Sequence, residues 1–132
     1  MKKIIATYFY QHDKADTYEY GNINLDPIEH EAAYWNTIYV FYKTSLLFNT
    51  DGYEHAFFTN KKDFVLLNTL IALGVKIYDD VGITFMNEKK WAAVKYIFDV
   101  LRYINESEDY SGIEKFVLLD TDILFISDLE GL

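Results

Sequence analysis

The order in which strand-like and helix-like segments alternate along the chain is the strongest constraint on its fold. Short runs rich in Ile, Val, Thr, Tyr and Phe, bounded by turn residues, predict strands at 3–10, 54–59, 75–78 and 115–119. The longer segments between them have helical composition or spacing, and they cover 26–48, 60–74 and 87–104. This alternation produces a mostly parallel sheet flanked by helices and joined by right-handed crossovers. The predicted fold class is therefore α/β.

Capping residues set the predicted starts of the helices. Asp26 can cap the first helix, with Pro27 at its first helical position. Asn60 can cap the second, which we expect to stop at Gly74, and Asn87 can begin the third. The apolar residues of the third helix recur at helical spacing and predict its core-facing side, which is Trp91, Val94, Phe98, Leu101 and Ile104.

Length and composition favour one globular domain. A chain of 132 residues fits a single core, so residues 1–132 are predicted to form one domain. With 51% hydrophobic and 18% aromatic residues, the chain is too apolar for a disordered protein. No apolar run approaches the roughly 20 residues of a membrane span. We therefore expect no transmembrane segment and a cytoplasmic location.

The acidic balance and the absence of cysteine exclude several classes of function. The formal charge of -9 would repel a phosphate backbone, so nucleic acid is not an expected partner. A phosphorylated small molecule stays compatible, because a lysine, backbone amides or a metal ion can reverse the potential inside one pocket. Without cysteine, disulfides and thiolate sites cannot form. His12, His30 and His55 lack metal spacing and are predicted to be surface residues.

Two carboxylates, Asp120 and Asp122, interrupt an otherwise apolar run at the end of the predicted fourth strand. Burying a carboxylate without a partner costs several kcal/mol, so the pair must be exposed at a turn or neutralised by a cation. Side chains two apart in an extended segment point the same way. Oxygen ligands of this kind suit Mg²⁺ or Mn²⁺, which keeps bound waters and bridges to substrate phosphates.

A purely structural interpretation of the same residues is also open. Asp-Thr-Asp can be a tight connection between two strands, because aspartate side chains bond readily to turn backbone. The spacing of the two acids does not distinguish this connection from a metal site.

The segments around these acids resemble the central part of GT-A type glycosyltransferases, especially the glycogenin-like family and related bacterial family-8-like enzymes. The resemblance is carried by residues 90–95 (KWAAVK), by the helix that continues to Tyr103 and by residues 115–129 (KFVLLDTDILFISDL). In that family, a helix with a basic residue leads into a hydrophobic strand that ends in Asp-x-Asp, and an apolar strand follows. The resemblance covers about the last third of the chain and implies a Rossmann-like GT-A fold.

The resemblance implies transfer of a sugar from a nucleotide-sugar donor, such as a UDP-sugar, with Mn²⁺ or Mg²⁺ between the motif and the diphosphate. Asp122 would be a metal ligand, and Asp120 would contact the metal or the donor ribose. Lys95 resembles the basic residue that faces the donor, although a solvated helix lysine is an equally simple interpretation. Thr7 and Tyr8, at the end of the first strand, resemble the place where the nucleoside is held.

The chain departs from the family because it stops ten residues after Asp122. GT-A enzymes continue well beyond the motif, and that part supplies the acceptor site and further metal ligation. The expected alternatives are a fragment that lacks its C-terminal part, a domain that works with a partner or as a homo-oligomer, and a non-catalytic GT-A-like binding module. A phosphatase of the haloacid dehalogenase type fits poorly, because its Asp-x-Asp motif usually lies near the amino end.

Overall fold

The structure of the chain, a computed structural model, describes residues 2–10, 27–83, 92–107 and 111–130, with the backbone alone for 27–31 and 92–95. The predicted loop 11–25, the caps Asp26 and Asn87, and Trp91 lie outside these residues. Within them, strands and helices alternate as β1 (Lys2–Phe9), α1 (Pro27–Phe48), β2 (Tyr53–Thr59), α2 (Leu67–Ala72), β3 (Lys76–Tyr78), α3 (Ala92–Glu106) and β4 (Ile113–Leu118). None of the described helices is long and apolar enough to cross a membrane.

The described strands form one parallel sheet in the order β3-β2-β1-β4. From β1, the chain moves outward through β2 to β3, and then returns to the other side of β1 as β4. The α/β class and the parallel sheet predicted from the alternation of segments are confirmed. The strand order also reverses direction at β1, which places a topological switch point between the carboxyl ends of β1 and β4.

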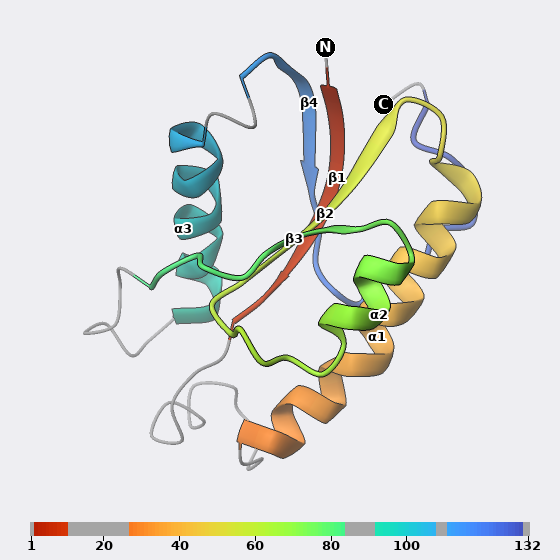
Figure 1. Cartoon of the computed structure of the whole chain (residues 1–132). Coiled ribbons are helices and arrows are strands. Elements are labelled where there is room, and N and C mark those ends of the chain that lie inside the picture. Colours follow the sequence, from red (N-terminus) through yellow and green to blue (C-terminus); the bar gives the residue numbers. More distant parts are fainter. Residues whose placement is uncertain (1, 11–26, 84–91, 108–110, 131–132) are drawn as a thin grey trace.

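Helices cover both faces of the sheet, with α1 and α2 on one side and α3 on the other (Figure 1). Successive residues of β1 point to opposite faces, as strand geometry requires. Ile5 and Phe9 join the apolar cluster under α1 and α2, whereas Ile4 and Ala6 join the cluster under α3. The two layers of helices therefore bury both sides of the central strand.

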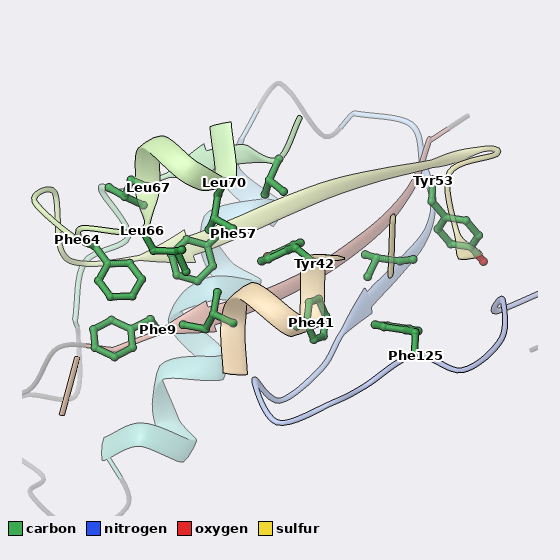
Figure 2. Close-up of a cluster of buried hydrophobic side chains, with 13 residues drawn as sticks. Phe9, Phe41, Tyr42, Tyr53, Phe57, Phe64, Leu66, Leu67, Leu70 and Phe125 are labelled. Carbon is green, nitrogen blue, oxygen red and sulfur yellow. The ribbon is translucent and has the colours of Figure 1, made fainter. Parts of the chain in front are cut away.

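The core under α1 is dominated by aromatic rings, and Figure 2 shows them gathered between α1, α2 and the sheet. The ring of Phe64 stacks on that of Phe9, with 4.8 Å between the ring centroids. The fully buried Tyr42 reaches from α1 to the sheet, where its hydroxyl accepts a hydrogen bond from the Thr7 amide and donates one to the Ala56 carbonyl. Burial raises the pKa of Tyr42, so the hydroxyl stays protonated and bridges β1 and β2.

The predicted start of the second helix at Asn60 is wrong. Helix α2 begins at Leu67 after a run of turns, and its cap residue, Leu66, makes no side-chain capping bond. The reason is tertiary packing, because Phe64 is buried against aromatic rings of β1 and β2. The predicted stop at Gly74 is confirmed, since this glycine follows the helix with a φ of 93° that favours glycine.

The predicted core-facing side of α3 is also wrong. Phe98 and Leu101 are exposed, whereas Tyr96 and Val100 are buried. The ring of Tyr96 packs on the rings of Tyr8 and Tyr10, and its hydroxyl donates to the Val81 carbonyl. The buried side of α3 therefore runs through Tyr96, Val100 and Ile104, which leaves Phe98 and Leu101 exposed. The predicted contribution of Ile104 is confirmed, and the side chains of Trp91 and Val94 lie outside the described residues.

Candidate functional site

The two acids singled out in the sequence lie at the carboxyl edge of the sheet. Strand β4 ends at Leu118, and the amide of Leu119 donates to the Ala6 carbonyl at 3.0 Å, which keeps the chain beside β1. Asp120 and Asp122 follow directly in a turn, and both are exposed. They therefore lie next to the switch point between β1 and β4, where open parallel sheets place their ligands.

Burial and the charges of the two acids raise the pKa values of two tyrosines at this edge. Burial raises the pKa of Tyr8 to about 12, and the charge of Asp120 and the phenol of Tyr34 add to the effect. Burial also raises the pKa of Tyr34, with further contributions from Asp122 and then Asp120. Because both carboxylates act on Tyr34, the four side chains share one region. Tyr34 comes from α1 and was not among the residues predicted from the sequence.

The turn that carries the acids is fixed at both ends by threonine hydroxyls. Before it, the fully buried Thr7 of β1 donates to the Leu119 carbonyl at 2.7 Å. After it, the Phe125 amide donates to the hydroxyl of Thr44 on α1 at 3.1 Å, and the Phe125 ring packs edge-on against Phe41 (Figure 2). The hydroxyl of Thr7 therefore holds the backbone next to Asp120, and its contact with a donor stays a prediction.

The segment after the acids does not form the apolar strand expected from the resemblance. Residues 119–130 run as turns and irregular chain, and the Leu129 amide donates to the Asn49 side chain of α1 at 2.8 Å. Its end approaches the start of β1, where Lys3 and Glu130 form an ion pair of 3.9 Å. The segment therefore returns along α1 (Figure 1). No second strand follows within these residues, so the expected connection between two strands does not form, but the two acids do lie in an exposed turn.

The donor chemistry at this edge fits a hard cation. Two exposed carboxylates offer oxygen ligands of the type that Mg²⁺ and Mn²⁺ bind, with waters and substrate phosphates completing the shell. Within the described residues, no group of three or more His, Cys, Asp or Glu side chains could hold a metal. A cation here would therefore depend on its substrate for further ligands. Lys95 lies near the start of α3, where the structure describes only its backbone.

A separate pocket of about 390 Å³ lies between α2 and β3, at the other end of the strand order from β4. Its lining mixes charged residues such as Lys62 and Asp79 with the side of α2. Neither of the predicted metal ligands lines it. The pocket is therefore distinct from the region of Asp120 and Asp122.

His55 is buried, so the prediction that it is a surface residue is wrong. Its Nε2 atom lies 2.7 Å from the Ser45 hydroxyl, and the Asn49 amide donates to the same hydroxyl at 3.4 Å. Burial lowers the pKa of His55 to about 4, which keeps the ring neutral. Strand β2 lies inside the sheet with both faces covered, which buries every residue from 55 to 59, and the apolar run that follows His55 was the signal for its position. His12 lies outside the described residues, as does the side chain of His30.

Comparison of the chain with protein-family models, with curated proteins and with solved structures finds no significant match. The comparisons therefore identify no glycosyltransferase family. Inference about function must rest on the geometry of the carboxyl edge.

Proposed function

We propose that this chain is the donor-binding part of a GT-A type glycosyltransferase, which binds a nucleotide-sugar through a divalent cation held by Asp120 and Asp122. One observation carries the proposal. The two carboxylates lie at the switch point between β1 and β4, beside Tyr8 and Tyr34, where a parallel sheet is expected to bind a ligand.

The charge of the protein explains why a cation is needed in this proposal. A formal charge of -9, with two acids at the edge itself, repels a diphosphate. Mn²⁺ or Mg²⁺ held by the two acids would reverse the local potential and would stabilise negative charge on a leaving diphosphate. Asp122 would ligate the metal, and Asp120 would contact the metal or the donor ribose.

The two tyrosines would supply hydrogen-bond donors to the same ligand. Because burial and the nearby carboxylates raise the pKa of Tyr8 to about 12, its hydroxyl keeps its proton at neutral pH. Tyr34 is held neutral by the same causes. Neutral phenols can donate to phosphate or ribose oxygens without adding charge. Thr7 serves as a positioning residue in this scheme, and Lys95 stays a predicted donor contact whose side chain lies outside the described residues.

Thermal melting with Mn²⁺ and nucleoside diphosphates tests the proposal. A ligand that binds only the folded chain at a hundred times its dissociation constant stabilises it by about 2.7 kcal/mol. We expect such a rise for Mn²⁺ with UDP, and none in Asp122→Asn. Asp51→Asn is the matched control, because Asp51 is an exposed acid at the opposite edge of the sheet, before β2.

Three results would decide against the proposal. They are no rise with any nucleoside diphosphate, a rise that persists in Asp122→Asn, and a rise that Asp51→Asn abolishes equally. Sugar release from a UDP-sugar, measured in the same samples, separates a transferase from a module that only binds the donor.

A further inference from the structure

Exposed apolar side chains gather along the outer side of α1 and the segment docked on it. Their exposed fractions lie between 41% and 82%, which is high for large hydrophobic residues. We call this surface the α1 stripe, and it consists of Val40, Leu47, Phe48, Leu124 and Ile126.

Hydrogen bonds show that the α1 stripe is continuous. Thr44 lies one helical turn from each of the three α1 members, because residues three and four apart are neighbours on a helix. Its hydroxyl accepts the Phe125 amide, so the two residues that flank Phe125 lie beside it. The bond from the Leu129 amide to Asn49 then keeps the segment along the same helix. The stripe therefore spans both chain segments.

The exposed apolar area of the α1 stripe is larger than that of a single exposed hydrophobic residue. Its five side chains expose on the order of 500 Å² of apolar surface, near the top of the roughly 300–600 Å² range for the largest patch on a monomer. Two such patches, packed together, bury about 1,000 Å² before their polar rims are added, which is the lower limit for a specific interface.

Charges on the two rims of the stripe are opposite in sign. The α1 rim carries the exposed Lys43, and the segment rim carries the exposed Asp128. A two-fold axis between the rims brings Lys43 of one copy toward the partner's Asp128, and the reverse pair forms at the same time. The surface is therefore complementary to itself.

We propose that a second copy of this chain covers the α1 stripe, which gives a two-fold homodimer with α1 and the docked segment at its centre. The interface is independent of the carboxyl edge, so it does not rest on the proposed function. Because of the two-fold symmetry, each substitution changes the interface at two places, once in each copy.

Sedimentation of the full chain over a wide concentration range tests the proposal. We expect a dimer for the wild type and a monomer for Leu47→Glu and for Ile126→Glu. Leu101→Glu is the matched control, because Leu101 is also exposed but lies on α3, on the other face of the sheet. Melting temperatures and circular dichroism of each variant establish that it folds.

A charge exchange gives a second, independent measurement. Lys43→Glu should weaken the dimer by at least tenfold in dissociation constant, and the double variant Lys43→Glu with Asp128→Lys should restore it. A monomeric wild type overturns the proposal, as does equal dissociation in Leu101→Glu. A folded monomer that cosediments with zwitterionic lipid vesicles would assign the stripe to a membrane surface instead and would also overturn it.

Discussion

Replacing Thr7 by valine removes one hydroxyl from the centre of the sheet without changing the shape of the side chain. The hydroxyl is fully buried and donates to the Leu119 carbonyl at 2.7 Å. A typical buried hydrogen bond contributes about 1 kcal/mol, and a carbonyl left without its partner raises the loss toward about 2 kcal/mol. We therefore expect Thr7→Val to lower the free energy of unfolding by about 1–2 kcal/mol, or roughly 4–8 °C in melting temperature.

The location of this bond predicts a second effect that a general loss of stability would not produce. Leu119 directly precedes Asp120, so the turn with the two acids should exchange its amide hydrogens faster in Thr7→Val, whereas α2 should not. Thr7→Ser keeps the donor and should restore slow exchange, even though it loses a methyl group.

Chemical denaturation gives the stability, and hydrogen exchange read by mass spectrometry gives the local effect. The reasoning is refuted if Thr7→Val unfolds within about 0.5 kcal/mol of the wild type and exchange at 119–122 is unchanged. It is also refuted if Thr7→Ser exchanges as fast as Thr7→Val.

Two further predictions concern titration. The pKa of His55 is about 4 when folded against 6.5 when exposed, so the unfolded chain takes up the proton first as the pH falls. Stability should be intact above pH 6.5 and should fall by at most about 3 kcal/mol down to pH 4, as urea unfolding measures, with no such contribution in His55→Gln. In Asp120→Asn, the pKa of Tyr8 should drop below about 12 but stay above its ordinary value, because burial is the larger cause. Alkaline absorbance titration, taken as the difference from Tyr8→Phe, measures this drop, and an unchanged titration would contradict the placement of Asp120.

The parts of the fold that sequence could predict are those that depend on segment order and local chemistry. Each strand was placed within two residues of its observed bounds, and α1 runs from Pro27 to Phe48 as its cap and composition indicate. What failed depends on contacts between distant residues. Phe64 is buried against β1, and α2 starts only at Leu67. The packing and hydrogen bond of Tyr96 fix the buried side of α3, which leaves Phe98 and Leu101 exposed.

The residues of the candidate site also fall into those that the sequence could predict and those that it could not. Asp120 and Asp122 could be located because a strand ends just before them, and the carboxyl ends of parallel strands meet at one edge. Tyr34 could not be found, because nothing local separates it from the other tyrosines, and only the packing of α1 on the sheet brings it near the acids. Thr7 was chosen for its place at a strand end, yet its role follows from a bond to a residue 112 positions away.

The segment after Asp122 has a consequence for the local stability of the edge. It adds no strand to the described sheet. It is held by the buried Phe125 ring, by the partly buried Ile123 and Leu129, by two amide bonds to α1 side chains and by the ion pair of Glu130 with Lys3. Detaching it disrupts far fewer contacts than separating the strands, so we expect it to come away while the sheet stays folded. The turn that carries the two exposed acids can thus change its conformation at a free energy well below that of global unfolding.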